Sequence, residues 1–160
     1  MITAVKEFTF DAAHMLAGHE GLCKNIHGHT YKVHVEVAHK NNLINDGPSE
    51  GMVVDFKHMK DLFNGHLFSQ LDHAFIYNTQ SDSALETKIA DLLIEEERKV
   101  YGMDCRPTAE NMTYHFYTEL IRIAQLMNTP IVITSVKVWE TPTSYAEFKP
   151  ATGGIVNESK

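Results

Sequence analysis

The sequence predicts a single α+β domain in which helices pack on an antiparallel sheet. Two segments of alternating apolar residues come first, helical patterns follow, and two more alternating segments close the chain. Strands that flank the helices, rather than alternating with them one by one, favour an antiparallel sheet. No repeat, low-complexity tract or linker divides the 160 residues, so we expect residues 1–160 to form one domain.

The two N-terminal strands are predicted in the first fourteen residues and over about residues 27–39. Apolar residues alternate from Phe8 to Ala12, and His14 continues the same parity. Side chains two apart in a strand point the same way, so His14 shares the apolar face. Tyrosine and valines alternate with polar residues along 31–37, and by the same parity His27 and His29 lie on the apolar side.

Helices are expected between the strand pairs. A turn over 41–51 precedes a helix that begins near Asp55 as its N-cap, and its apolar stripe is Phe56, Met59, Phe63 and Leu67. A second helix is expected over about 83–101, ending at Gly102, with Leu85, Ile89, Leu92 and Leu93 on one side. A third begins after Thr108, and its inward residues are Met112, Phe116, Leu120, Ile123 and Met127.

The last two strands are predicted in "PIVITSVKVWE" and "TPTSYAEF". In the first of these, Glu140 has the parity of Val136 and Val138. A carboxylate on an apolar face is costly unless it is paired. Glu140 therefore either meets a ligand that offers N–H donors or marks the point where the strand turns into water.

Composition restricts the partners of the chain. The formal net charge is −7, with 14 Lys and Arg against 21 Asp and Glu, which disfavours nucleic acid and anionic membranes as partners. No apolar segment approaches the roughly 18 residues that span a bilayer. Two cysteines make a poor disulfide framework. We therefore expect a cytoplasmic protein that acts on a small molecule.

The motif "HGH" suggests a metal site. On a strand, His27 and His29 reach toward one ion, and His14 supplies a third nitrogen from the neighbouring strand. Three histidines with an open fourth position describe a catalytic Zn²⁺ site. The alternative is a pair of ordinary strand histidines.

Cys23 precedes this pair by four residues and has two possible uses. It either completes a closed structural site of one cysteine and three histidines, or stands free beside the metal as a base or nucleophile. A nearby positive charge lowers a thiol pKa from its usual value of about 8.5. The spacing does not decide between these uses.

The dipeptide Asp72–His73 is a candidate proton relay. A carboxylate beside an imidazole fixes its tautomer and supports proton transfer. Adjacent residues need not face each other, and an Asp–His pair in a loop is often without function.

Taken in order along the chain, these motifs resemble the 6-pyruvoyl-tetrahydropterin synthase family from about residue 5 to residue 148. The matching segments are "FDAAH", "CKNIHGHTYKV", "VVDF", "LDH", "PTAEN" and "VWET". The spacing of three residues between Cys23 and His27 resembles that of the family branch in the queuosine pathway, whose members form 6-carboxytetrahydropterin. A long connection over 78–106 departs from compact members, and no basic cradle for a triphosphate is evident.

The resemblance implies a role for each candidate residue. The ligands of Zn²⁺ are His14, His27 and His29; Cys23 is the thiolate that abstracts a proton; Asp72 and His73 relay protons; and Glu140 anchors the pterin ring. The implied substrate is 7,8-dihydroneopterin triphosphate, whose side-chain hydroxyls bind zinc. The implied products are 6-carboxytetrahydropterin, acetaldehyde and triphosphate.

The resemblance also implies an architecture. It is the T-fold, or tunnelling fold, whose four-stranded antiparallel sheet pairs with neighbouring subunits to close a barrel, as a trimer or hexamer. Active sites in such assemblies lie at subunit boundaries. Three alternatives stay open: the sister enzyme that forms the pyruvoyl product, a zinc hydrolase that uses metal-bound hydroxide, and a non-catalytic binding module with structural zinc.

Overall fold

The computed structural model describes residues 1–151 and confirms an α+β architecture. The strands are β1 (Ala4–His14), β2 (His27–His39), β3 (Ala74–Asn78), β4 (Val100–Met103), β5 (Ile131–Thr141) and β6 (Ser144–Phe148). The helices are α1 (Phe56–Phe63), α2 (Ser69–Leu71), α3 (Ala84–Glu95) and α4 (Ala109–Leu126). A π-helical stretch at Asn64–Phe68 joins α1 to α2, and a 3₁₀ turn covers Leu22–Lys24.

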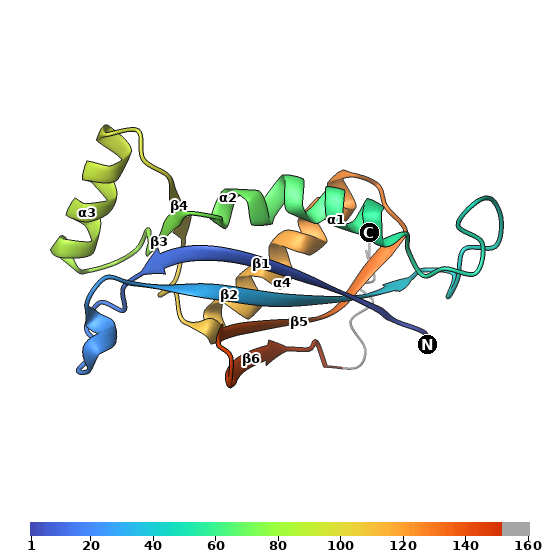
Figure 1. The fold of residues 1–160 in the computed structure, drawn as a ribbon, viewed down its shortest axis with the longest axis horizontal. Helices are drawn as coiled ribbons and strands as arrows, with labels where there is room; N and C mark the ends of the chain where they lie inside the picture. Colours follow the sequence, from blue (N-terminus) through green and yellow to red (C-terminus); the bar gives the residue numbers. More distant parts are fainter. Residues whose placement is uncertain (152–160) are drawn as a thin grey trace, which may run out of the picture.

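The sheet has six strands in the order β4-β3-β1-β2-β5-β6, so the expectation of a four-stranded antiparallel sheet is wrong. The four predicted strands form its antiparallel part, β1-β2-β5-β6. β3 and β4 extend it beyond β1, and both pairings there are parallel. Figure 1 shows the long strands side by side with β3 and β4 at one end, beside α3.

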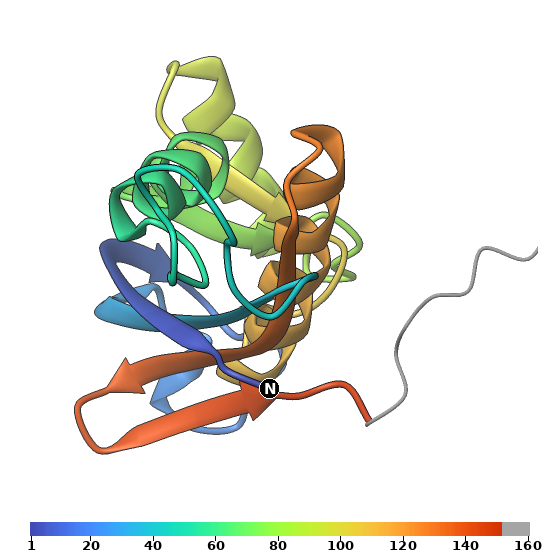
Figure 2. The ribbon, with the colours of Figure 1, turned by 90° about the vertical axis from the view of Figure 1, so that its right-hand side faces the viewer.

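The core lies between the sheet and the helices on one face. Phe8 and Phe10 of β1 pack against Phe68 and Phe116 from the helical layer. The ring centroids of Phe8 and Phe68 are 4.3 Å apart, and those of Phe10 and Phe116 are 6.2 Å apart. Figure 2 shows the strands curling around one side of this layer. The predicted strand parity is confirmed, because Phe8, Phe10 and His14 are all buried.

Two predicted helix N-caps are confirmed. The carboxylate of Asp55 accepts hydrogen bonds from the backbone N–H groups of Lys57 and His58, and the hydroxyl of Thr108 accepts one from Asn111. Each cap satisfies donors that the first turn of a helix leaves without partners. The cap at Thr108 fixes where α4 begins and therefore where Pro107, which contacts the site, lies.

Several predicted helical faces are wrong in detail. α3 ends at Glu95 rather than near 101, because the following residues turn back into β4. Leu85 and Leu92 are 61% and 57% exposed, and the residues of α3 that are buried are Glu86 and Ala90. Phe56 and Met127, at the ends of their helices, are also exposed. Phe56 and Met127 lie in terminal turns that reach past the core, whereas Leu85 and Leu92 lie on the exposed side of α3.

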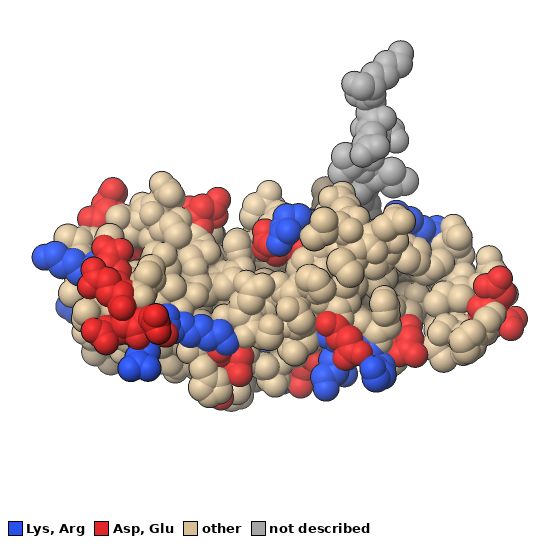
Figure 3. All heavy atoms as spheres, turned by 90° about the horizontal axis from the view of Figure 1, so that it is seen from above, with Lys and Arg blue, Asp and Glu red and all other residues tan. Residues whose placement is uncertain are grey.

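Charged side chains are scattered over the surface. In the view of Figure 3, acidic side chains gather at the end of the molecule that carries α3, with basic side chains among them. Within the described residues, no helix combines the length and apolar content needed to cross a bilayer. The surface is consistent with the acidic net charge of −7.

Candidate metal centre and active site

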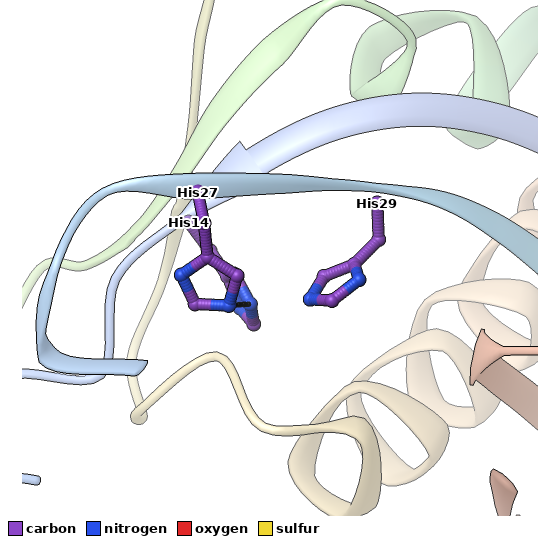
Figure 4. A group of neighbouring side chains, drawn as sticks. All are labelled: His14, His27 and His29. Atoms are coloured by element: carbon purple, nitrogen blue, oxygen red, sulfur yellow. Dashed lines mark hydrogen bonds between the residues drawn. The ribbon is translucent and has the colours of Figure 1, made fainter. Parts of the chain in front are cut away.

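Three histidines converge at the end of the β1–β2 ribbon. The antiparallel register places His14 opposite His27 and Ala12 opposite His29. One ring nitrogen from each histidine lies within 4.8 Å of the other two, and Figure 4 shows the three rings turned toward a common centre. The structure therefore brings together the three predicted ligands, and they could hold a metal ion.

Backbone carbonyls fix the orientation of two of these rings. His14 Nδ1 lies 2.8 Å from the oxygen of Pro107, and His27 Nδ1 lies 2.8 Å from the oxygen of Asn25. A carbonyl only accepts, so each Nδ1 carries the proton and each Nε2 presents a lone pair. The two Nε2 atoms are 3.1 Å apart. Two lone pairs at that distance repel unless a cation lies between them.

Burial favours the neutral form of two of the three imidazoles. His14 is fully buried, and burial, with smaller contributions from the neighbouring His27 and His29, lowers its pKa from 6.5 to about 4 against the opposing effect of the Pro107 carbonyl. Burial also lowers the pKa of His29. Within residues 1–151, His29 Nε2 is out of solvent and has no hydrogen-bond partner. Neutral imidazole is the form that binds a metal.

Glu140 reaches the same centre from β5. Its Oε1 lies 3.5 Å from His14 Nε2 and 3.8 Å from His29 Nε2. Its side chain is 30% exposed, so the carboxylate borders both the imidazoles and the solvent. Of the two predictions for Glu140, the structure favours the inward-facing carboxylate.

Cys23 lies in the 3₁₀ turn of the segment that joins β1 to β2 and is half-buried. Its carbonyl accepts a hydrogen bond of 2.8 Å from the N–H of Leu16. The convergent group of ligand atoms comprises three histidines and does not include its sulfur. This arrangement does not favour the closed site of one cysteine and three histidines.

Asp72 and His73 form a separate pair just before β3. His73 Nδ1 lies 3.0 Å from Asp72 Oδ2, and both side chains are exposed. The backbone N–H of Asp11 donates to Asp72 Oδ1 at 3.2 Å, and this bond, together with the bond to His73, lowers the pKa of Asp72. His73 adopts a φ of +61°, a conformation that is uncommon for a residue with a side chain.

The pair opens onto a groove of about 760 Å³ between the sheet and α3. The groove is lined by Asp11, Ala13 and Thr30, which have the opposite strand parity to His14, and also by Ala12 and His29. His73 therefore opens onto the groove beside α3, whereas the ring nitrogens of the three histidines converge on a separate centre. The structure does not bring the pair onto the histidines of the same chain.

Sequence reasoning missed the groups that orient the imidazoles. The carbonyls of Asn25 and Pro107 and the hydroxyl of Tyr31, which lies 3.3 Å from His14 Nδ1, contact the ligand rings. Carbonyl groups leave no trace in residue identity. Tyr31 shares the strand parity of His27 and His29, so its position was available as a signal.

Comparisons with known proteins agree with this geometry. The family model described as 6-pyruvoyl tetrahydropterin synthase matches residues 3–151. A relative from Haemophilus influenzae, named 6-carboxy-5,6,7,8-tetrahydropterin synthase, is 39% identical over 93% of this chain and 99% of its own length. A relative of the same name from Rickettsia bellii is 33% identical over 92% of this chain and 99% of its own length.

Solved structures share the fold. An uncharacterized protein from Wolinella succinogenes superposes with a TM-score of 0.73 at 22% identity, over 94% of this chain and 98% of that protein. The Plasmodium vivax 6-pyruvoyltetrahydropterin synthase gives 0.65 at 19% identity, over 92% and 96%. The expected T-fold is thereby confirmed, and the family model, together with the Haemophilus relative, shows that the chain belongs to the 6-pyruvoyl tetrahydropterin synthase family.

Proposed function

We propose that this chain is a 6-carboxy-5,6,7,8-tetrahydropterin synthase. In this reaction 7,8-dihydroneopterin triphosphate yields 6-carboxytetrahydropterin, acetaldehyde and triphosphate, and the pterin product enters queuosine biosynthesis. The observation that carries the proposal is the convergent imidazole triad with Glu140 beside it, in a chain that aligns over 93% of its length with a relative of that name. The triad supplies the metal site and Glu140 the polar anchor that such chemistry needs.

The metal proposed for the triad is Zn²⁺, held by His14, His27 and His29. Three neutral imidazoles with an open position are a typical donor set of catalytic zinc. The 3.1 Å approach of two unprotonated Nε2 atoms and the unpartnered Nε2 of His29 support a cation at this place. When bound, zinc supplies Lewis-acid polarisation of oxygen atoms on the substrate.

The residues around the triad have distinct proposed tasks. The carboxylate of Glu140 accepts N–H groups of the pterin ring and holds it beside the imidazoles. The thiolate of Cys23 takes a proton from the carbon chain of the substrate. Cys23 lies outside the ligand group, which leaves its sulfur available as a base.

Asp72 and His73 are proposed to relay protons to a site on another subunit. His73 lines the groove beside α3, and neither residue belongs to the convergent group of ligand atoms of its own chain. A trimeric or hexameric barrel, in which each pocket combines residues of neighbouring subunits, resolves this separation. In such an assembly the carboxylate of Asp72 holds the imidazole of His73 in one tautomer.

The test is the identity of the products. Purified protein, loaded with one zinc per chain, is incubated with 7,8-dihydroneopterin triphosphate, and pterins and aldehyde are separated chromatographically. We expect acetaldehyde and 6-carboxytetrahydropterin in equal amounts. A pyruvoyl product without acetaldehyde moves the chain to the sister activity, and turnover of neither kind refutes the proposal.

A further inference from the structure

The segment over 15–26, which carries Cys23, has few hydrogen bonds to the rest of the molecule. Its own backbone bonds run from Leu16 N–H to the Cys23 carbonyl, from His19 N–H to the Leu16 carbonyl, from Lys24 N–H to the Gly21 carbonyl, and from Asn25 N–H to the Leu22 carbonyl. Five of its residues between Gly18 and Leu22 are exposed. Gly18 takes a φ of +76°, which favours glycine. Met15, at the start of the segment, is buried in a cluster with Phe75 and Ala90, so the exposed part that follows depends on contacts from other elements.

Arg106 provides that external hold. Its Nη2 donates a hydrogen bond of 3.0 Å to the carbonyl of Leu16, across 90 positions of sequence. Leu16 in turn donates its N–H to the carbonyl of Cys23 at 2.8 Å. Among the hydrogen bonds of the described chain, the bond from Arg106 is the one that ties residues 16–25 to a distant element. A chain of two bonds thus runs from the guanidinium to the backbone of the candidate catalytic thiol.

The guanidinium has no other evident structural task. Within residues 1–151, Arg106 forms no ion pair with an acidic side chain, and its Nε is out of solvent without a hydrogen-bond partner. Covering a cation without an acidic partner is costly. A surface arginine chosen for stability would instead point into water or pair with a carboxylate, as Arg122 does with Glu119.

The backbone of Arg106 and Pro107 also contacts the candidate metal ligand His14. Two donors bind the carbonyl of Arg106, namely Asn111 Nδ2 and the Thr108 N–H, both at 2.8 Å. These bonds fix the dipeptide to the first turn of α4. The next carbonyl, that of Pro107, binds His14 Nδ1. Arg106 and Pro107 are therefore anchored to a rigid helix end, with one contact to the thiol segment and one to the imidazole triad.

We propose that Arg106 is a positioning residue that sets the location of the Cys23 thiol relative to the histidine triad. The inference rests on the proposed function, since it assumes that Cys23 acts as a base. Arg106 acts through Leu16 rather than by touching substrate. Misplacing a reacting group by about 1 Å costs about 100-fold in rate, so loosening this tether lowers kcat and leaves ligand binding at the triad in place.

The experiment compares Arg106→Met with Arg122→Met in the zinc-loaded protein. Methionine keeps much of the aliphatic bulk and removes the donors, and Arg122 is an exposed arginine of α4 outside the site. Arg106→Lys tests rescue by a residue that retains one cationic donor. The three readouts are amide hydrogen exchange of residues 15–26, zinc content, and kcat and KM with the pterin triphosphate.

We expect Arg106→Met to accelerate exchange of the Leu16 amide at least about 10-fold and to lower kcat about 10- to 100-fold. KM and zinc content stay close to wild type. Arg106→Lys partly restores slow exchange of the Leu16 amide and partly restores kcat. Arg122→Met changes neither the exchange rate nor kcat. Unchanged exchange in Arg106→Met overturns the tether. Faster exchange with unchanged kcat overturns its role in catalysis, and loss of zinc shows that Arg106 supports the metal site instead.

If Arg106→Met does not fold, Arg106→Gln and Arg106→Lys are measured in the same way and decide by the same criteria. Hydrogen exchange needs no substrate. A protein without pterin turnover therefore refutes the proposed function while the exchange result still decides whether Arg106 holds the thiol segment.

Discussion

Acidification should destabilise the metal-free protein through His14. This imidazole is fully buried, and its pKa is lowered from 6.5 to about 4. The folded state therefore binds fewer protons than the unfolded chain between these values, so stability is greatest above about pH 6.5 and falls as the pH decreases toward 4. This dependence of stability on pH is opposite to that of a histidine whose charged form is stabilised by an ion pair.

The size of the effect follows from the two pKa values. A difference of about 2.5 pKa units corresponds to roughly 3.4 kcal/mol at about 1.36 kcal/mol each. Between about pH 7.5 and about pH 4.5, the window in which most carboxylates stay ionised, linkage gives roughly 2.5 kcal/mol of this total. That is a large part of the roughly 5–15 kcal/mol by which a typical domain is stable.

The assay is urea unfolding in the presence of a chelator, repeated across this pH window for wild type and His14→Gln. Glutamine does not titrate, so the difference between the two pH slopes isolates His14 from other groups. We expect wild type to lose roughly 2.5 kcal/mol more than the variant on going to the acidic end. Equal slopes, or a wild type that gains stability on acidification, refute the account of a neutral buried imidazole.

Three further predictions concern the site. Zinc at about 100 times its dissociation constant should raise the unfolding free energy by about 2.7 kcal/mol, and His29→Ala should abolish this gain in calorimetry; an undiminished gain in the variant excludes His29 as a ligand. Glu140→Gln should raise KM with zinc content unchanged, because the carboxylate lies beside two imidazoles and is proposed to bind the pterin ring; loss of zinc instead identifies Glu140 as a ligand. Asp72→Asn should lower kcat about 10²- to 10⁴-fold. When subunits of Asp72→Asn and Cys23→Ala are dissociated and reassembled together, the mixed assemblies should regain turnover. No recovery argues against pockets shared between subunits.

The sequence was sufficient to predict the framework of the site. Strand alternation at Phe8, Phe10 and His14 and at His27, His29 and Tyr31 is a local signal with a period of two, and the structure places these side chains on one face. The caps at Asp55 and Thr108 are equally local. Such alternation can be recognised in the sequence because the same face is buried along the whole length of each strand.

The missed features depend on contacts between distant parts of the chain. β3 and β4 have five and four residues, too short to display alternation, and their parallel pairing follows from where α2 and α3 deliver them. The exposure of Leu85 and Leu92 depends on how far α3 stands away from the sheet. The carbonyl of Pro107 and the reach of Arg106 to Leu16 are properties of the folded backbone.

The sheet also explains why the candidate residues fall into two groups. His14 and Asp11 are three positions apart on β1, so their side chains leave opposite faces. The triad and Glu140 converge on one centre, whereas Asp72 binds the backbone N–H of Asp11 and His73 lines the groove beside α3. In the proposed synthase, neighbouring copies of the chain bring the two groups together.

The most direct test of the account is a side-by-side measurement of zinc content and pterin products for wild type and Cys23→Ala. We predict that the variant retains the zinc content of wild type, because the ligand group consists of three histidines, and that its turnover falls by at least about 100-fold, because the proposed function assigns the proton-abstracting thiolate to Cys23. A variant that retains turnover, or one that loses its zinc, contradicts a site in which three imidazoles hold the metal and a separate thiol carries out the chemistry.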